Sequence, residues 1–272
     1  MTTNNFVSEL DNIFMEWQQK MKTTGDAYYD ENGELAFTKD GVIYKNGEKT
    51  EITEQKWVNS SKRILFLLKD QHQIRDEGKP FWPEDIRYWL KDAEGDNYDA
   101  KQNKEKNRNL VPRFIKNLAY LFWGLSKTTS DEDCAWWYNE VTMHLEKVKE
   151  FFNTQPFALI ECKKQPGDGK LDDSELKRHL TKYENLLRQE IKILDPNMIV
   201  CTSQHIYDFV LKMYSHEELV EIKGHNSIKF HYPSGALVFC SYHPSAPYLS
   251  DDKIYEGVMD HYRAFLKSIY NL

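Results

Sequence analysis

The sequence predicts an α/β protein with a mostly parallel sheet, because short apolar runs alternate with longer helical patterns. Four runs are continuously apolar and too short for helices: 63–69, 157–161, 198–202 and 236–241. Such runs are typical of strands buried on both faces. The segments between them carry apolar residues at helical spacing, and this alternation predicts βαβ crossovers.

The helical segments follow the spacing of their apolar residues. In the first of them Leu10, Ile13, Phe14, Trp17 and Met21 share one face. The predicted helices cover 8–23, 109–125, 131–152, 174–194, 205–214 and 251–270.

Two more extended regions are predicted outside the four apolar runs. The runs LAFT and VIYK at 35–45, separated by glycine, predict a small hairpin, and 219–232 predicts a second hairpin that ends at Pro233. We therefore expect a helix-and-hairpin extension over residues 1–55 and one α/β domain over 56–272.

Composition limits the classes of function. The chain has 36 Lys+Arg and 43 Asp+Glu, a formal net charge of −7, and 14% aromatic residues. The aromatic content argues against disorder, and the acidic balance argues against a protein that coats nucleic acid through bulk charge. A local basic cleft on an acidic body remains compatible with DNA.

Cysteine spacing and hydropathy give further expectations. None of the four cysteines forms a CxxC pair, so we expect no metal, no metal cluster and no other cofactor. No stretch approaches a membrane span, and the N-terminus lacks a signal-peptide pattern. The sequence therefore predicts a cytoplasmic protein without a membrane partner.

Polar loops directly follow the four apolar strands. In parallel sheets, ligands bind at this carboxyl edge, in the loops that follow the strands. The loops are 70–72, 161–164, 203–205 and 242–246.

Two of these loops carry residues suited to hydrolysis. Asp70 ends the first strand, and His243 begins a His-Pro-Ser turn after the last. A carboxylate can orient water and stabilise positive charge, while an imidazole can stabilise a departing anion. The alternative is that both residues belong to ordinary turns, with Asp70 as a cap and Ser245 as the N-cap of a helix.

The loop at 161–170, ECKKQPGDGK, is basic and rich in glycine. Its backbone amides with Lys163, Lys164 and Lys170 are candidates for holding phosphates. It is not a P-loop, because the GxxxxGK[ST] spacing fails. A second basic segment spans 101–116, and for both segments a solvated surface loop is the alternative.

Taken in order, five segments resemble motifs of the uracil-DNA glycosylase superfamily, over roughly residues 60–270. They are RILFLLKDQHQ at 63–73, DEGKPFWPED at 76–85, FALIECKKQPGDGK at 157–170, LLRQEIKILDPNMIVCTSQHIYDFVL at 186–211 and VFCSYHPSA at 238–246. No single segment is specific, but all five occur in the family's order.

The resemblance implies a three-layer α/β sandwich with a central four-stranded parallel sheet flanked by helices, and a cleft for an extruded nucleotide. It implies that Asp70 orients water, that His243 stabilises the leaving base, and that Phe81 stacks on it. Base contacts from Glu161 and Gln71 are also expected. The expected DNA contacts are those of Lys163, Lys164, Lys170, Ser245, Tyr248 and Leu249, with Tyr248 or Leu249 as a wedge in the duplex.

Two departures from the family pattern bear on specificity. Glu161 stands where the family has a base-reading Asn, and Gln71 stands where a Pro is usual. Ionised Glu offers acceptors only, whereas Asn offers a donor and an acceptor. An ionised Glu161 would favour a donor-rich edge, such as the N4 amino group of a cytosine-like base, over uracil.

These observations predict a DNA glycosylase-like hydrolase that excises a flipped-out non-standard or modified base, in duplex or single-stranded DNA. Modified cytosine is one candidate base, and defence against phage is one candidate role. Two alternatives stay open: a non-catalytic nucleic-acid or nucleotide binder that retains the fold, and an enzyme acting on free nucleosides or nucleotides.

Overall fold

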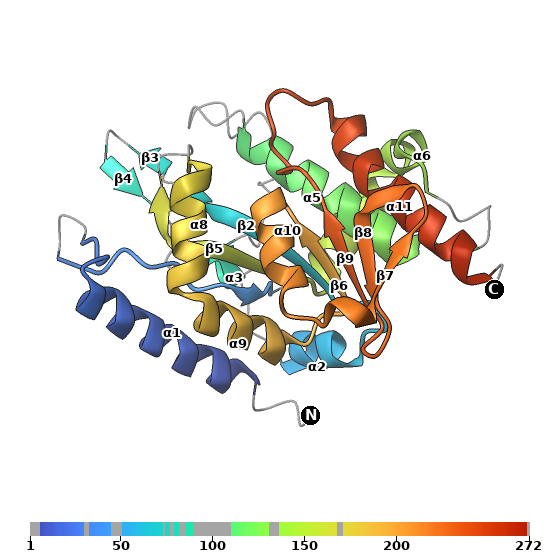
Figure 1. The fold of residues 1–272 in the computed structure, drawn as a ribbon. Coiled ribbons are helices and arrows are strands. Elements are labelled where there is room, and N and C mark those ends of the chain that lie inside the picture. Colours follow the sequence, from blue (N-terminus) through green and yellow to red (C-terminus); the bar gives the residue numbers. More distant parts are fainter. Residues whose placement is uncertain are drawn as a thin grey trace.

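A seven-stranded sheet lies between two layers of helices in the computed structural model (Figure 1). The structure describes residues 6–29, 33–44, 51–72, 74–76, 79–81, 85–89, 110–130, 136–167 and 171–270. Within these ranges the strand order is β1-β5-β2-β6-β9-β8-β7, and a separate two-stranded sheet pairs β3 with β4.

The centre of the large sheet is parallel and its edges are antiparallel. The parallel strands β5, β2, β6 and β9 are adjacent, β1 pairs with β5, and β8 joins β7 to β9. The strands are β1 (Gly41–Val42), β2 (Ile64–His72), β3 (Ile74–Asp76), β4 (Lys79–Phe81), β5 (Ala158–Gly167), β6 (Met198–Cys201), β7 (Leu219–Ile222), β8 (His225–His231) and β9 (Ala236–Cys240). The predicted four-stranded parallel sheet is thus confirmed, with three antiparallel strands added at its edges.

The helices bury both faces of the sheet. On one face α5, α6, α7 and α11 pack over Phe66 and Leu68, and on the other α1, α8, α9 and α10 pack over Leu65 and Leu67. This alternation explains why the strand at 63–69 is apolar throughout. The bounds are α1 (Phe6–Thr24), α2 (Glu51–Asn59), α3 (Ile86–Trp89), α5 (Leu110–Lys127), α6 (Tyr138–Met143), α7 (Leu145–Thr154), α8 (Asp173–Lys182), α9 (Glu184–Leu194), α10 (Gln204–Leu211) and α11 (Asp251–Tyr270), with a 3₁₀ turn, η4, at His216–Glu218.

Two predicted helices are each divided in two. Residues 131–135 of the predicted helix 131–152 lie outside the described part of the chain, and the rest of it contains α6 and α7, which meet at His144. The segment 174–194 forms α8 and α9, which meet at Tyr183. Both junction residues leave the helical region of the backbone, with ψ of 30° and 16°. Neither junction contains a glycine or proline that would have signalled the break.

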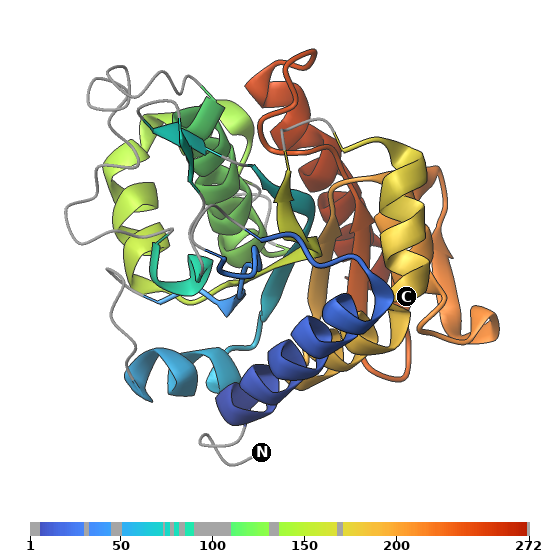
Figure 2. The same cartoon turned by 90° about the vertical axis from the view of Figure 1, so that its left-hand side faces the viewer.

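The N-terminal segment differs from the predicted hairpin. Residues 36–44 run beside β5: Thr38 N donates to Lys164 O at 2.8 Å, and Gly41 pairs with Leu159. Helix α1 lies along α9 (Figure 2) and shares one core with the sheet through residues such as Trp17. Residues 6–44 therefore extend the α/β unit rather than fold beside it. The predicted hairpin at 219–232 is present as β7 and β8.

Candidate active site at the carboxyl edge of the sheet

The sheet topology brings the candidate catalytic residues to one edge. Strand β2 lies between β5 and β6, so the connections from β2 to β5 and from β5 to β6 run over opposite faces of the sheet. A crevice is expected where the order reverses, at the carboxyl end of β2. Asp70 lies there, and the loop after β9 carries His243 at the same edge, which is uppermost in Figure 1.

Asp70 is a buried carboxylate with one oxygen that forms no hydrogen bond to the described residues. Its side chain is 9% exposed, and Oδ2 has no hydrogen-bond partner among the described residues. Burial raises the pKa of Asp70 to about 6; the charge of Lys163 opposes this rise and that of Glu175 adds to it. At neutral pH Asp70 is therefore ionised and able to accept hydrogen bonds from a ligand or water.

His243 is held as a neutral imidazole. Nδ1 accepts a hydrogen bond from the backbone N–H of Ser245 at 3.2 Å, and the Ser245 hydroxyl lies 2.8 Å from the same atom. The ring stacks on Phe114 with centroids 5.5 Å apart. Burial, aided by the charge of Lys69, lowers the pKa of His243 to about 4. The neutral ring must carry its proton on Nε2, which gives the site a hydrogen-bond donor without a formal charge.

The loop that carries His243 is fixed to the first turns of α5. Asn117 Nδ2 donates to Pro244 O at 2.7 Å, and Arg113 donates to the carbonyls of Ala246 and Leu249. Asp251, at the start of α11, joins these donors by accepting from Asn117 at 2.9 Å and Arg113 at 2.7 Å. Three loop carbonyls are thus satisfied by side chains of a helix, which fixes the position of the imidazole.

Glu161 is buried next to the carboxylate of Asp70. It is 3% exposed, lies on the same sheet face as Leu159, and its Oε2 has no partner among the described residues. Burial raises the pKa of Glu161 well above its usual range, and the charges of Asp70 and Asp40 add to the rise against that of Lys164. This rise favours the protonated form of Glu161, which has one donor and one acceptor, over the expected ionised form, which offers acceptors only.

Lys164 does not fit its expected role in DNA binding. Its side chain has no exposed surface, and Nζ lies 2.6 Å from Asp40 Oδ1 and 2.9 Å from a Glu190 carboxylate oxygen. Burial lowers the pKa of Lys164, but the charges and hydrogen bonds of Asp40 and Glu190 outweigh it and raise the pKa above its usual value. Trp17 and Phe14 of α1 enclose the ammonium group at 5.1 and 5.6 Å from their ring centroids. Lys164 is part of the core between α1 and β5.

Other basic residues expected to contact phosphates are buried or paired with carboxylates. Lys163 is 8% exposed and faces Asp70 and Glu175, which makes it part of the site rather than a surface cation. In the segment 101–116, Arg113 and Lys116 pair with Asp251. Lys170 and residues 101–109 lie outside the described part of the chain.

The remaining expected site residues have the following places. Gln71 lies in β2 directly after Asp70, and Phe81 lies in β4, where its backbone pairs with Ile74. Ser245 contacts His243, as described above, and Leu249 packs against the apolar core. Tyr248 is 74% exposed, in the same loop as His243.

Two exposed aromatic rings flank His243. Tyr242, 50% exposed, precedes it, and the ring of Tyr248 lies edge-to-face against that of Tyr242 at 6.3 Å. Exposed aromatic rings beside a site are typical stacking surfaces for unpaired bases. The sequence-based interpretation named Tyr248 but missed Tyr242, whose position next to His243 was the available signal.

Other residues of the site gave no recognisable signal in the sequence. Phe114, Arg113 and Asn117 belong to one amphipathic helix, where an aromatic or amide residue normally indicates packing. Gly167 lies against Asp70 at the end of β5 and was grouped with a loop expected to hold phosphates. Their roles depend on contacts between segments far apart in the chain.

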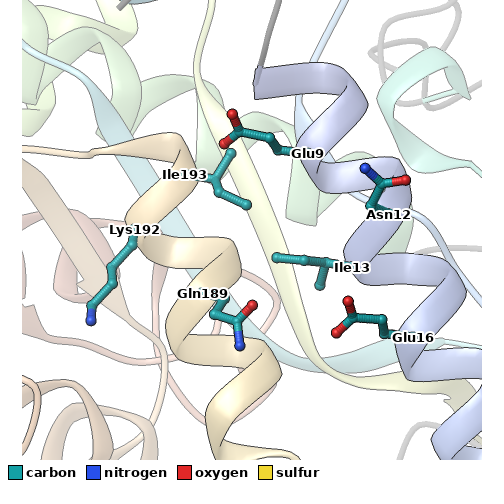
Figure 3. A pocket seen from close by; sticks show the side chains of 7 residues that line it. All are labelled: Glu9, Asn12, Ile13, Glu16, Gln189, Lys192 and Ile193. Carbon is teal, nitrogen blue, oxygen red and sulfur yellow. The ribbon is translucent and has the colours of Figure 1, made fainter.

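A groove on the opposite side of the sheet from His243 does not contain these residues. It lies between α1 and α9, measures about 370 Å³, and is lined by side chains of mixed charge (Figure 3). Its lining residues are Glu9, Asn12, Ile13, Glu16, Gln189, Lys192 and Ile193.

Within the described ranges, no cluster of three or more His, Cys, Asp or Glu residues is arranged to hold a metal. Similarly, none of the described helices has the length and apolarity needed to span a membrane.

A family model matches most of the chain. The family model described as "Uracil DNA glycosylase superfamily" matches residues 63–264, which include all of the strands β2 to β9. None of the curated proteins matches the chain. The matched range starts at β2 and ends within α11, so it contains both Asp70 and His243.

Proposed function

The chain belongs to the uracil-DNA glycosylase superfamily, and from this we propose that it hydrolyses the N-glycosidic bond of a base extruded from DNA. The observation that carries the proposal is that a carboxylate and an imidazole lie at the same edge of the sheet. Asp70 is an ionised carboxylate with one oxygen that accepts no hydrogen bond from the described residues, and His243 is a neutral donor fixed by its loop.

The two residues suit the two charges that develop when the bond breaks. The sugar becomes oxocarbenium-like, and Asp70 would stabilise this positive charge while orienting the attacking water. The base departs with negative charge, which the Nε2–H of His243 would stabilise by a hydrogen bond. The pKa values of about 6 for Asp70 and about 4 for His243 leave both groups in the required state at neutral pH.

Base recognition is assigned to Glu161, with Phe81 as a stacking ring and Gln71 as a further contact. Neutral Glu161 complements an edge with one acceptor and one donor, as in uracil, and equally the amino-type edge of a cytosine derivative. The reason for excluding uracil therefore disappears, while modified cytosine stays a candidate. We propose a non-standard or modified pyrimidine as the substrate base; a role in defence against phage depends on modified cytosine being the base released.

The DNA surface is proposed to centre on the loop after β9. Tyr242 and Tyr248 offer exposed rings on which bases beside the extruded nucleotide can stack, and Leu249 and Ser245 lie in the same loop. This assignment shifts DNA binding away from Lys164, which is buried. Both duplex and single-stranded DNA are compatible with such a surface.

The test is base release from end-labelled oligonucleotides that carry one uracil, hydroxymethylcytosine or glucosylated hydroxymethylcytosine. Strand scission in alkali after incubation reports the abasic site. We expect release by the wild type and loss of release by Asp70→Asn and His243→Ala, with Lys192→Met, in the α1–α9 groove, as an active control. DNA binding without release from any of these substrates would support the non-catalytic alternative instead.

A further inference from the structure

The end of β5 bends around the end of β2. Asp70 pairs with Lys163 and His72 with Gly167, with an irregularity between the two pairs. Between them β2 advances from residue 70 to 72, while β5 advances from 163 to 167. The extra length of β5 makes a bulge, and bulges of this kind redirect side chains beside functional sites.

Gly167 lies directly against the carboxylate of Asp70. A Cβ added at Gly167 would overlap Asp70 Oδ2 and lie 3.4 Å from Lys163 Nζ. Any residue other than glycine at position 167 would therefore force the carboxylate of Asp70 to move. The described backbone of Gly167 has no positive φ, so the requirement arises from space and not from backbone conformation.

Lys163 lies between two carboxylates. Its Nζ is 4.0 Å from Asp70 Oδ2 and 3.4 Å from Glu175 Oε1. The Lys163 and Asp70 side chains are 10% and 9% exposed, whereas that of Glu175 is 38% exposed. At this separation Lys163 attracts Asp70 electrostatically but does not form a hydrogen bond with Oδ2, which is buried and accepts none from the described residues.

Among the described residues, the titratable groups that face Asp70 lie on three elements. Lys163 and Glu161 lie on β5, Glu175 on α8 and Lys69 on β2 itself. Lys163 and Lys69 favour the ionised form of Asp70 and Glu175 opposes it, while the pKa of Glu161 is itself raised by burial and by the charge of Asp70. Lys163 contributes the larger of the two favourable effects.

We propose that the end of β5 positions the catalytic carboxylate: Lys163 holds Asp70 in its ionised form, and Gly167 leaves the space that the carboxylate occupies. The proposal rests on the proposed function for the role of Asp70 itself. It assigns Lys163 and Gly167 as positioning residues, which act through Asp70 and do not contact the substrate. It also replaces the phosphate-binding role that the basic, glycine-rich loop suggested.

The first experiment measures single-turnover base release between pH 4.5 and 9 for variants of the charged residues. In the wild type the rate should rise through about pH 6 as Asp70 ionises. Lys163→Met should move this rise to higher pH by about one pH unit, so that the rate falls about tenfold at about pH 5 and recovers toward the wild-type rate at about pH 9. Lys163→Arg should restore the wild-type profile, and Glu175→Gln should move the rise to lower pH.

Opposite movements of the rise in Lys163→Met and Glu175→Gln cannot come from general damage to the fold. An equal loss of rate at every pH in Lys163→Met, with the rise unmoved, would overturn the assignment of Lys163. Titration of the Asp70 carboxyl by ¹³C NMR in the same variants, with Asp70→Asn to assign the signal, tests the charge effect without any substrate. Failure of base release in the wild type would therefore count against the proposed function, and an unmoved NMR titration against the inference.

The second experiment tests the space at Gly167. Gly167→Ala should lower the rate about 100-fold with little change in melting temperature, because the carboxylate must move away from its position. In the Asp70→Asn background the same change should have no further effect on the residual rate. Gly257→Ala is the matched control, since an added Cβ there meets nothing within 4 Å. An additive loss in the double variant would show that Gly167 acts elsewhere.

Discussion

The backbone N–H of Ser245 donates a hydrogen bond to Nδ1 of His243 at 3.2 Å. A backbone N–H can only donate, so Nδ1 must be an acceptor and the neutral ring must carry its proton on Nε2. Two residues of the same turn thereby determine which ring nitrogen carries the proton and can act as a donor. A charged imidazolium is not needed, because the lowered pKa keeps the ring neutral above about pH 4.

Replacement of His243 tests this electrostatic role. His243→Ala should lower the rate of base release by 10²–10³-fold, the usual cost of removing one donor aimed at a developing anion. The rise of rate near pH 6 should stay in place, because it belongs to Asp70. Single-turnover pH profiles of the variant and wild type provide the measurement.

Exposed His216, in the 3₁₀ turn before β7, offers a control for the histidine change. His216→Ala should match the wild type at every pH. If the pH 6 rise vanished with His243, the titrating group would be the imidazole, and the neutral-donor assignment would be wrong.

The buried charge of Asp70 should lower the free energy of unfolding at neutral pH. Its pKa rises from 3.8 in the unfolded chain to about 6 in the fold, so the folded state binds more protons between these values. Stability therefore falls as pH rises from about 4 to 6, by on the order of 3 kcal/mol. Asp70→Asn should abolish base release yet raise the free energy of unfolding at pH 7.5, with the gain disappearing near pH 4. Urea unfolding at both pH values measures the difference.

Asp26 provides a control of opposite sign. Burial tends to raise its pKa, but hydrogen bonds from Lys182, Tyr183 and Arg178 outweigh burial and lower it to about 2. Asp26→Asn should therefore destabilise the protein at pH 7.5. Destabilisation by Asp70→Asn at that pH as well would contradict the raised pKa of Asp70.

Glu161 should be replaceable by its amide. Burial raises the pKa of Glu161 and so favours its protonated form, and Glu161→Gln preserves the one donor, one acceptor and side-chain length of that form. We expect base release within about threefold of the wild type, and a loss of more than tenfold in Glu161→Ala, which removes both hydrogen bonds to the base. Competition between uracil and cytosine-type oligonucleotides gives the base preference of each variant. A large loss in Glu161→Gln would show that the ionised carboxylate reads the base.

Anchoring of the His243 loop should affect both stability and rate. Asn117→Ala leaves Pro244 O without its buried donor, at a cost of about 1–3 kcal/mol. The rate of base release should fall because the imidazole loses its fixed position, while the pH of half-maximal rate stays unchanged. Thermal unfolding and the pH profile measure the two effects, and Asn12→Ala, exposed on α1, is the control. Unchanged rates in Asn117→Ala would show that the loop does not need this anchor.

The four central strands were predictable because each of them is buried on both faces. The four apolar runs form β2, β5, β6 and β9, which make up the expected parallel sheet, whereas their order in the sheet was not predicted. The pairing of residues 36–44 with β5 was not predictable, because it joins segments more than 100 residues apart. Local sequence pattern in that region is equally compatible with a hairpin.

In the candidate site, the sequence placed Asp70 and His243 at the carboxyl edge of the sheet, where the structure also has them. It did not show which of two adjacent side chains points into the site and which into the core. Lys163 and Lys164 are adjacent, yet strand alternation directs one to Asp70 and the other into the core with Asp40. The apolar run ends at 161 and so predicts a loop for both lysines, whereas β5 continues to Gly167. Likewise, the charge state of Glu161 depends on burial and on two carboxylates from distant segments.

The position of Asp40 determines what can be removed from this chain. Asp40 accepts from Lys164 Nζ and from the backbone N–H of Glu161 at 2.7 Å, so a residue outside the matched range 63–264 supports the strand that carries the site. A fragment limited to the matched range would remove from Lys164 both its partner Asp40 and the Phe14 and Trp17 rings that cover it, and would leave β5 as an open edge. The family segment is therefore not a self-sufficient module, and shortened versions of the chain for crystallography or screening should begin before α1.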